Sequence, residues 1–508
     1  MPAKTLMIQG TASSAGKSVI AAGLCRIFWQ DGFKVAPFKA QNMALNSFVT
    51  REGGEIGRAQ AVQAEAAGIE PSVHMNPVLL KPEADNRSQI IVLGQVAKNM
   101  EASQYYSYTP NLLKIIKNSL GHLLSTYDIV VIEGAGSPAE INLRDREIVN
   151  MRIAGMVNAP VLLVGDIDRG GVFASIVGTL ELLTMQECDL IKGFIINKFR
   201  GDLKLLKPGL DILEKRTGKP VLGVIPYFRD IGIAQEDSVY LDERQTGSAN
   251  GTIDVAVIRL PHISNYDDFD PLEEQGCAVR YVSTVPELGS PDLLILPGTK
   301  STIADLIKLQ QQGLAQAIVR LAQSGIPVIG ICGGYQMLGK SIHDPDKVES
   351  RHDSINGLGL LDTTTIFRND KTTTQVKARV YADKGLLKGL KGVEVTGYEI
   401  HMGQTRSQRC QPTLQVFETP RGKVDYFDGI VGSNGLIFGT YIHGLFHNGE
   451  FTRRFLNRLR QLRRLPETTT VSINKQEIYD KLADIIRSNL DMSQVYKIAL
   501  GRKGDAKS

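Results

Sequence analysis

Gly10-Thr-Ala-Ser-Ser-Ala-Gly16-Lys17-Ser18 follows an apolar run at Thr5–Gln9 and leads into a stretch of helix-forming residues. Glycines allow such a loop to curl so that successive backbone N–H groups face phosphate oxygens, and the following helix N-terminus adds partial positive charge. In a loop of this kind the lysine reaches the β- and γ-phosphates and the serine hydroxyl binds Mg²⁺. The sequence therefore predicts an ATP site whose loop residues are Gly10, Thr11, Gly16, Lys17 and Ser18.

Other β-rich runs repeat the strand, loop and helix pattern on both sides of a polar stretch between Ile231 and Thr252. Helix-compatible segments separate most runs, which predicts right-handed crossovers and largely parallel sheets with sites at the carboxyl ends of strands. The expected strands are Thr5–Gln9, Lys34–Phe38, Ile129–Glu133, Val161–Gly165, Gly193–Asn197, Val221–Pro226, Asp254–Leu260, Val279–Ser283, Leu293–Leu296, Val328–Ile331 and Leu436–Ile442. We expect an α/β protein with a first domain at 1–232, a linker at 233–251, a second domain at 252–450 and a helical tail at 451–508.

Three further residues at strand ends are candidates for the ATP site. Glu133 ends an apolar strand and is the candidate Mg²⁺ ligand, directly or through water, ahead of Asp128. Lys39 ends the second strand, where it would bring another cation to the transferring phosphoryl group. Asn197 lies at the end of a later strand, and there it either contacts adenine or forms a turn.

One cysteine has a setting unlike that of the other four. Cys332 follows an apolar strand in Ile329-Gly-Ile-Cys-Gly-Gly334, the sequence form of a nucleophile elbow. The flanking glycines tolerate a strained turn, and the helix that follows favours the thiolate, which is the nucleophile. Backbone N–H groups at Gly298 and Gly333 are candidates for an oxyanion hole.

A cysteine nucleophile needs a base, and two histidines in Gly-flanked apolar settings compete for that role. His443 ends another strand late in the chain, and we favour it over His401. An early cysteine and a late histidine resemble the order in class I glutamine amidotransferases, where a Glu two residues after the histidine orients it. Leu445 stands at that position here, so the third member is either absent or supplied elsewhere.

An ATP site and a glutaminase site in one chain together indicate a reaction class. A carboxylate is a poor electrophile, so ATP would first convert it to an acyl phosphate. Ammonia released from glutamine at Cys332 would then displace phosphate and leave an amide. This pairing predicts a glutamine-hydrolysing, ATP-dependent carbon–nitrogen ligase with ATP and Mg²⁺ as cofactors.

Several segments resemble the cobyric acid synthase family of glutamine-hydrolysing corrinoid amidotransferases, and the similarity covers almost the whole chain in order. These segments are Val35–Met43, Leu45–Ser47, Gly57–Gln60, Met75–Pro82, Glu133–Asn142 and Gly165–Phe173. The five residues between the loop glycines, one more than the standard spacing, match the loop of dethiobiotin synthetase-like enzymes. The resemblance implies a P-loop NTPase-like (dethiobiotin synthetase-like) parallel-sheet domain followed by a class I glutamine amidotransferase-like α/β domain.

The resemblance also implies the substrate. Family members amidate the b, d, e and g carboxylates of adenosylcobyrinic acid a,c-diamide to give adenosylcobyric acid, with one ATP and one L-glutamine used per amide. Polar residues in the similar segments then become candidates for contact with the corrinoid or the acyl phosphate. They are Gln41, Asn42, Asn46, Asp166, Asp168 and Arg169.

Two alternatives remain at this stage. One is cobyrinic acid a,c-diamide synthase, which has the same two activities and fewer target carboxylates. The other is a P-loop partitioning or switch ATPase, a class that carries a signature lysine early in the loop, where this chain has Ala12.

Composition limits the setting in which the chain works. A net charge of +4 over 508 residues does not favour nucleic acid, and no apolar run approaches the roughly 18 residues of a membrane span. The five cysteines are scattered without a CxxC pair, which predicts reduced thiols and no zinc site. Because no signal-peptide pattern follows Met1, we expect a cytoplasmic enzyme, and the sequence leaves its oligomeric state open.

Overall fold

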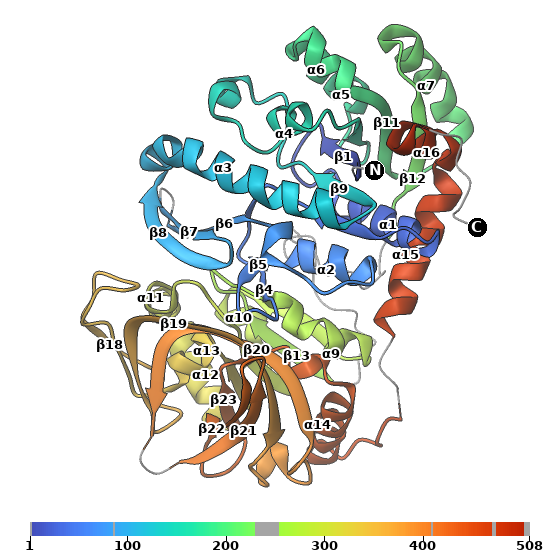
Figure 1. Ribbon diagram of the computed structural model, residues 1–508. Coiled ribbons are helices and arrows are strands. Elements are labelled where there is room, and N and C mark those ends of the chain that lie inside the picture. The colour runs from blue at the N-terminus through green and yellow to red at the C-terminus, as the bar shows by residue number, and fades with distance from the viewer. Residues whose placement is uncertain (1–2, 85–86, 229–252, 408–409, 470–473, 502–508) are drawn as a thin grey trace.

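Strand β1 (Lys4–Gly10), which leads into the glycine-rich loop, lies inside a six-stranded parallel sheet (Figure 1). The computed structural model describes residues 3–84, 87–228, 253–407, 410–469 and 474–501, so the expected linker at 233–251 lies outside the described residues. The sheet order is β12-β11-β10-β1-β9-β2, and every predicted strand of this domain is confirmed to within two residues. The other strands are β2 (Val35–Phe38), β9 (Ile129–Glu133), β10 (Val161–Asp166), β11 (Ile191–Phe199) and β12 (Val221–Pro226).

Helices cover both faces of this sheet because alternate residues of its strands point to opposite sides. On β1, Leu6 and Ile8 pack in one hydrophobic core with α1, α15 and α16, while Met7 packs in the other with α3, α4, α5 and α7. The bounds are α1 (Lys17–Gln30), α2 (Arg58–Ala66), α3 (Ala102–Thr126), α4 (Met151–Met156), α5 (Val172–Leu182), α6 (Met185–Leu190), α7 (Leu203–Thr217), α15 (Lys475–Asn489) and α16 (Met492–Leu500).

The helical tail expected at 451–508 is shared between the two domains. Helix α14 (Gly449–Leu462) packs through Phe451 and Phe455 into the core of the second domain. Helices α15 and α16 return to the first domain, where α15 lies so close to α1 that a Cβ at Gly23 would be 2.2 Å from Ile486 Cδ1. The C-terminal segment therefore completes the core of the domain that begins the chain.

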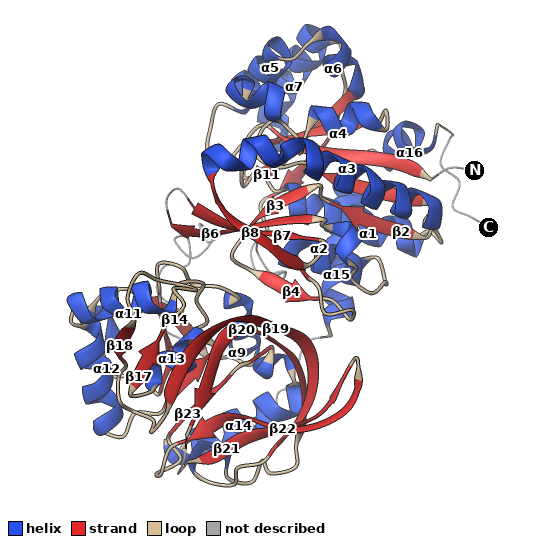
Figure 2. Cartoon of the chain, turned by 60° about the vertical axis from the view of Figure 1, so that its left-hand side comes forward, coloured by secondary structure: helices blue, strands red, loops and turns tan. Residues whose placement is uncertain are grey.

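Small strands between β2 and β9 form two sheets that the sequence did not predict. Several have only three residues, too few for a periodic pattern to stand out. They lie between the two main sheets, and β4 contacts the long strands β19 and β20 of the second domain (Figure 2). Their bounds are β3 (Gln41–Met43), β4 (Ser47–Val49), β5 (Glu55–Gly57), β6 (Val78–Ala84), β7 (Arg87–Val92) and β8 (Gln95–Glu101).

The second domain is built on a 12-stranded sheet in which β14-β13-β15-β16-β23 run parallel and β22, β21 and β19 continue the sheet antiparallel. The strand expected at Leu436–Ile442 is split in two, and its second part turns to pair with β20. The strands are β13 (Asp254–Ile258), β14 (Ala278–Val282), β15 (Leu293–Leu296), β16 (Val328–Ile331), β17 (Ser341–His343), β18 (Ser354–Asn356), β19 (Thr364–Val380), β20 (Glu394–Arg406), β21 (Gln411–Thr419), β22 (Gly422–Val431), β23 (Ile437–Thr440) and β24 (Ile442–His443).

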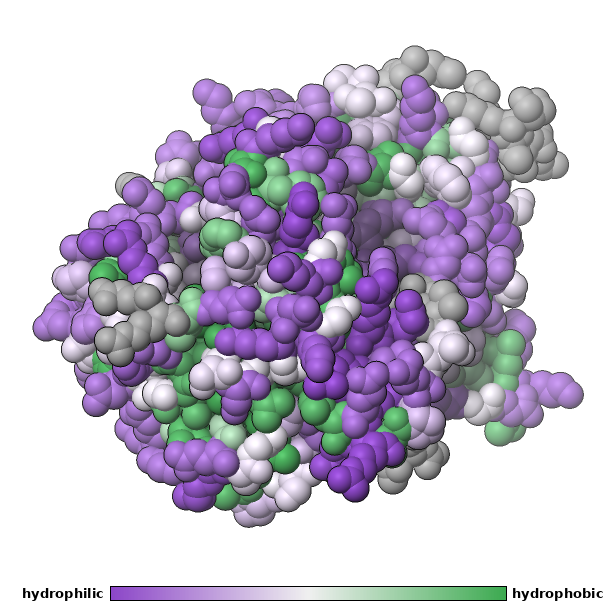
Figure 3. All heavy atoms as spheres, turned by 90° about the horizontal axis from the view of Figure 1, so that it is seen from below, coloured by the Kyte–Doolittle hydropathy of each residue, from purple (hydrophilic) through white to green (hydrophobic). Residues whose placement is uncertain are grey.

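Short helices flank this second sheet. Apolar residues of α11 and α12, among them Leu306 and Ile318, join the strand residues in one continuous core. The helices are α9 (Asp270–Glu274), α10 (Val285–Leu288), α11 (Thr302–Gln311), α12 (Leu314–Gln323) and α13 (Gly333–Leu338). Side chains seen from below the molecule are mostly hydrophilic, with hydrophobic ones in small scattered patches (Figure 3).

Buried charges lie where the two domains meet. Glu55 on β5 accepts from Lys81 at 2.6 Å and also pairs with Lys371, which comes from β19 of the second domain. Burial opposes ionisation of Glu55, but the two lysines outweigh it and lower the pKa of this carboxyl. Removing one partner of such a buried cluster typically costs about 3–5 kcal/mol, so the domains are joined by a contact that depends on all three charges.

The described part of the chain contains no helix that is both long and apolar enough to cross a membrane. All five cysteines are free thiols, as the sequence predicts.

Candidate active sites

The glycine-rich loop and its following helix form the first site. Gly16 has a φ of 95°, which favours glycine, and a Cβ there would lie 2.0 Å from Asn197 Nδ2. Asn197 itself donates from that nitrogen to Ala15 O at 2.9 Å. The predicted adenine contact, Asn197, therefore supports the loop from beneath, and its side chain is engaged with the loop backbone.

Lys17 lies at the centre of the loop and is nearly buried. Its ammonium group donates to Ala12 O at 2.9 Å and to Gly136 O at 3.0 Å. Gly136 follows β9, so the lysine joins the loop to the end of the neighbouring strand. Because these acceptors are neutral carbonyls, a phosphate oxygen would be the stronger partner for the ammonium group.

Glu133 is the meeting point of the predicted phosphate and metal residues. Its Oε1 accepts from Ser18 Oγ at 2.8 Å and from Lys39 Nζ at 2.9 Å. Burial opposes the charged form, but Lys39 and the hydrogen bonds outweigh it and lower the pKa of Glu133. The structure thus brings together Ser18, Lys39 and Glu133, which the sequence assigned from three separate segments.

This donor set fits Mg²⁺. A hydroxyl and an ionised carboxylate, hydrogen-bonded to each other beside a phosphate loop, are the hard oxygen ligands that Mg²⁺ takes alongside water and substrate phosphates. Asp128, the weaker candidate, lies at the other end of β9, where its carboxylate accepts from Lys34 N at 3.1 Å. Glu133 is therefore the carboxylate that the fold delivers to the loop.

Sequence reasoning missed two glutamines that hold Glu133. Gln63 Nε2 donates to Glu133 Oε2 at 2.5 Å, and Gln60 Nε2 lies 3.4 Å from the same oxygen. Both lie on α2, and their only sequence signal was a position inside the segment Gly57–Gln60 or just after it. Glutamines on a helix are normally read as solvent-facing, and here they are buried.

The six predicted substrate residues fall into separate places. Asp166 ends β10 and pairs with Lys198 at 3.0 Å, and Asp168 pairs with Arg200 at 2.9 Å. Arg169 is largely exposed beside them, 4.0 Å from Asp166. This acidic and basic group lies at the carboxyl end of the sheet, as a substrate site would.

The other three candidates lie nearer the domain interface. Gln41 is half-buried on β3, and Asn42 beside it is buried and donates to Gln60 at 3.0 Å. Asn46 is fully buried, and its Oδ1 accepts from the backbone N–H of Tyr266 in the second domain at 3.3 Å. The structure thus gives Asn46 a role in joining the domains.

Cys332 forms the predicted elbow between β16 and α13. It has a φ of 50°, a strained value for a residue with a side chain, and Gly333 and Gly334 open the helix that follows. A Cβ at Gly334 would lie 1.9 Å from Leu296 O, so only glycine allows the elbow to approach the neighbouring strand this closely. The strain is the structural signature of a side chain held above a sheet edge.

His443 lies against Cys332, and an aspartate orients it. The two side chains share a hydrogen bond. On its other side, His443 Nδ1 lies 2.7 Å from Asp268 Oδ2, and Asp268 Oδ1 accepts from Gly444 N at 2.7 Å. Burial opposes the imidazolium, but Asp268 and Cys332 together raise the pKa of His443 to about 10. A protonated imidazole beside the sulfur stabilises a thiolate, which is the form that attacks.

Asp268 is the third member that the sequence left unassigned at Leu445. It lies on η3 (Tyr266–Phe269), a short turn early in the second domain, far from His443 in the chain. The adjacent acidic residues Asp267 and Asp268 were a weak signal, because charged pairs usually lie on solvated loops. Only the fold brings this turn to the histidine.

His401, the competing base, lines the same pocket but has a different environment. Its Nδ1 lies 2.8 Å from Gly403 O, and its ring stacks on Tyr441 with centroids 3.8 Å apart. Because a carbonyl only accepts, Nδ1 carries the proton. Burial lowers the pKa of His401 to about 4, so this ring is neutral and has no carboxylate to orient it as a base.

The glycines proposed for the oxyanion hole lie around the same pair. A Cβ at Gly298 would be 2.8 Å from His443 Cε1, so this glycine makes room for the imidazole. A Cβ at Gly333 would be 3.2 Å from the backbone N of Thr299. The N–H groups of Gly333 and Thr299 are thus neighbours, which is the arrangement that two oxyanion donors require.

Both domains line the pocket in front of Cys332. Cys332, His443 and His401 share it with Lys81 and Gln89, which come from β6 and β7 of the first domain. Comparisons with known proteins agree with the two-site arrangement. Residues 6–239 match the CobQ/CobB/MinD/ParA nucleotide binding domain, and residues 254–451 match the CobB/CobQ-like glutamine amidotransferase domain.

Whole-length relatives decide the family. A protein of Dehalococcoides mccartyi (strain CBDB1) named cobyric acid synthase is 59% identical over 496 residues, 98% of this chain and 99% of the relative. Proteins of the same name from Thermoanaerobacter sp. (strain X514) and Sorangium cellulosum (strain So ce56) are 54% and 51% identical, each over at least 97% of both chains. The chain belongs to the cobyric acid synthase family. Its first domain is thus a nucleotide-binding synthetase domain, its second a glutamine amidotransferase domain, and the whole an ATP-dependent ligase.

For this member of the cobyric acid synthase family, replacing Asp268 by asparagine is expected to lower kcat for glutamine hydrolysis by about 10²-fold, the lower end of what a general base contributes. Asparagine lacks the charge that holds the imidazolium, so the pKa of His443 falls. The alkaline limb of the kcat/KM profile then moves to lower pH, because the imidazolium is lost earlier. Glutamate release followed across pH measures both effects, and an unchanged profile would remove Asp268 from the site.

Proposed function

We propose that the chain amidates the b, d, e and g carboxylates of adenosylcobyrinic acid a,c-diamide, using ATP and glutamine, to give adenosylcobyric acid. The observation that carries the proposal is the Cys332–His443–Asp268 arrangement in one chain with a phosphate loop, in a family whose members bear that name. The loop alone would also suit a switch ATPase, but such a protein has no use for a strained cysteine beside a charged histidine.

In the glutaminase half, the Cys332 thiolate attacks the carboxamide carbon of glutamine. The N–H groups of Gly333 and Thr299 hold the oxyanion, and the imidazolium of His443 gives its proton to the departing nitrogen. Ammonia leaves and a thioester remains on the sulfur. Water, deprotonated by the now neutral His443, hydrolyses the thioester to glutamate and restores the thiolate.

In the synthetase half, a carboxylate oxygen of the corrinoid attacks the γ-phosphorus of ATP, and ADP leaves. Lys17 and the loop N–H groups hold the phosphate oxygens, and Lys39 adds a second cation beside them. Ser18 and Glu133 would hold Mg²⁺, which supplies charge neutralisation at the β- and γ-oxygens. Ammonia then attacks the acyl carbon, and phosphate leaves with the amide formed.

Substrate contacts follow from the positions already described. Asp166, Asp168 and Arg169 lie at the exposed carboxyl edge of the first sheet, and Gln41 lies on β3 between the two domains, so these four remain in the proposed substrate set. Asn42 and Asn46 are buried and bonded within the protein, and we assign them to holding α2 and the interface.

A mass-resolved time course tests the proposal. Purified protein is given ATP, Mg²⁺, glutamine and adenosylcobyrinic acid a,c-diamide, and successive products each gaining one amide are expected, ending at the fully amidated acid. If the diamide is untouched while cobyrinic acid gains two amides, the enzyme is the a,c-diamide synthase. If glutamine is never hydrolysed under any condition, the switch ATPase becomes the better assignment.

A further inference from the structure

Helix α2 of the synthetase domain touches both active sites. Gln63, near its C-terminus, donates to Glu133 in the ATP site at 2.5 Å. Arg58, its first residue, forms a buried ion pair with Asp267 of the amidotransferase domain at 2.9 Å between Nε and Oδ2. Asp267 immediately precedes Asp268, the partner of His443. A nine-residue helix therefore reaches from the metal carboxylate to the turn that carries the glutaminase acid.

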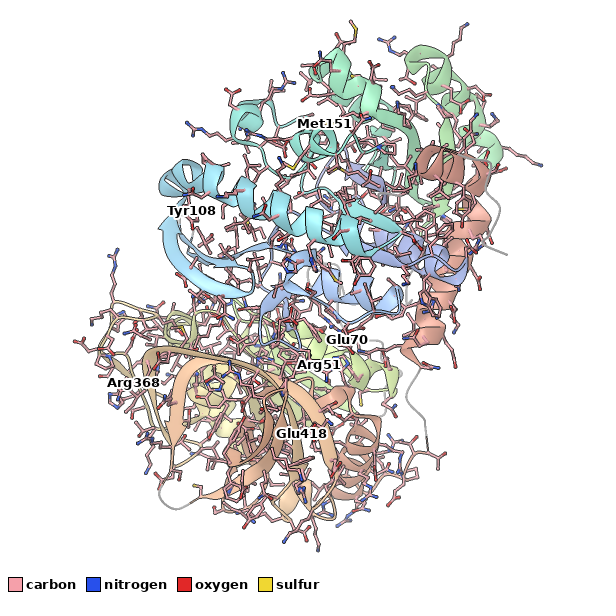
Figure 4. The ribbon with its side chains drawn as sticks, in the orientation of Figure 1. Arg51, Glu70, Tyr108, Met151, Arg368 and Glu418 are labelled. Carbon is pink, nitrogen blue, oxygen red and sulfur yellow. The ribbon has the colours of Figure 1, made fainter. Side chains whose placement is uncertain are left out.

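The turn η3 depends on the other domain for its position. The backbone N–H of Tyr266 donates to Asn46 Oδ1 at 3.3 Å, and Asn265 Oδ1, just before the turn, accepts from Ser47 N at 3.2 Å. Arg58 adds the ion pair to Asp267. The loop from β4 to β5, with Arg51 at its turn, lies at the level where the domains meet (Figure 4).

Two adjacent buried carboxylates make a cation necessary at this place. Asp267 and Asp268 are both buried, and each raises the cost of charge on its neighbour. Burial and Asp268 raise the pKa of Asp267, while Arg58 acts in the opposite direction. His443 balances Asp268, and Arg58 balances Asp267. The second of these cations comes from the synthetase domain.

We propose that Arg58 is a positioning residue of the glutaminase site: through Asp267 it holds the turn that sets Asp268 against His443. The glutaminase then reaches its full rate only when its domain is docked on α2. The inference rests on the glutaminase half of the proposed function. It adds that the synthetase domain supplies part of the support for the catalytic histidine.

Arg58→Met tests the inference in the full-length enzyme. Methionine fills much of the space but leaves Asp267 without its cation, so η3 shifts and His443 loses its alignment. The kcat for glutamine hydrolysis is expected to fall roughly tenfold or more, since small displacements in an active site have effects of this size. KM for glutamine changes little, because glutamine contacts the pocket and not Arg58. Ammonia-dependent synthesis is retained.

A double-mutant cycle separates positioning from general loosening. If Arg58 acts through Asp267, then Asp267→Asn and the Arg58→Met/Asp267→Asn double variant should lower kcat by similar factors, well short of the product of the single effects. Arg58→Lys keeps the charge and should fall between wild type and Arg58→Met. Should Arg58→Met fail to fold, Asp267→Asn and Arg58→Lys carry the same comparison.

Gln375→Leu is the matched control, because it removes another interdomain hydrogen bond, from Gln375 Nε2 to Val49 O at 2.9 Å, away from α2 and η3. Its kcat for glutamine should stay near that of wild type. Equal losses in Arg58→Met and Gln375→Leu would reduce Arg58 to a general docking contact and overturn the inference, as would multiplicative effects in the cycle. A wild-type enzyme without glutaminase activity would instead refute the proposed function.

Discussion

Replacing Cys332 by alanine is expected to lower glutamine-dependent amide synthesis by roughly 10⁴-fold or more, since removal of a nucleophile from a catalytic unit has effects of this size. Alanine keeps the Cβ, so the strained φ of 50° and the elbow are retained. Synthesis with added ammonia should continue near the wild-type rate, because the phosphate loop lies in the other domain. Amide formation measured with each nitrogen source gives the comparison.

Cys188→Ala is the control for this variant. Cys188 is a free, half-buried thiol on α6 whose Sγ lies 3.2 Å from Leu180 O, and nothing places it near either site. Both activities should survive its replacement. Loss of ammonia-dependent synthesis in Cys332→Ala would mean that the two halves do not work as separate catalysts, and the two-site mechanism would fail.

Replacing Lys17 by alanine is expected to lower amide synthesis from either nitrogen source by about 10³-fold, because a cation on the transferring phosphoryl group contributes on that order. The loss comes from weaker stabilisation of charge on the β- and γ-phosphate oxygens. Glutamine hydrolysis measured without corrinoid should continue, since Cys332 and His443 are untouched. ADP release and amide formation are the direct measurements.

Lys207→Ala provides the matched control, because Lys207 is an exposed lysine on α7 paired only with the exposed Asp211. Its replacement should leave synthesis unchanged. If Lys17→Ala still made amide at a wild-type rate with ammonia, the ATP site would have to be sought elsewhere in the chain.

Local sequence was sufficient for the parts of both sites that a single strand end defines. The loop from Gly10 to Ser18, Glu133 after β9 and Cys332 after β16 each announce themselves, because a strand followed by special residues and a helix is a contiguous pattern. The parallel strands of both domains were predicted for the same reason. The three-residue strands β3, β4 and β5 were not, since so short a run has no period to detect.

Partners that come from distant segments needed the fold. Asp268 replaces the glutamate expected at Leu445, yet it lies on a turn some 175 residues before His443. Gln60 and Gln63 hold Glu133 from a helix whose polar residues looked solvent-facing. Asn46, a substrate candidate in the sequence, turned out to join the domains because its side chain points to Tyr266.

The sequence by itself determined the two chemistries and the order of the two domains, because phosphate loops and nucleophile elbows are built from contiguous residues with local backbone requirements. Tertiary structure alone decided which acid orients His443, which base faces Cys332, and that Arg58 of one domain supports the site of the other. Those choices depend on contacts between segments far apart in the chain. Burial makes them matter, because a charge removed from water must find its partner wherever the fold brings one.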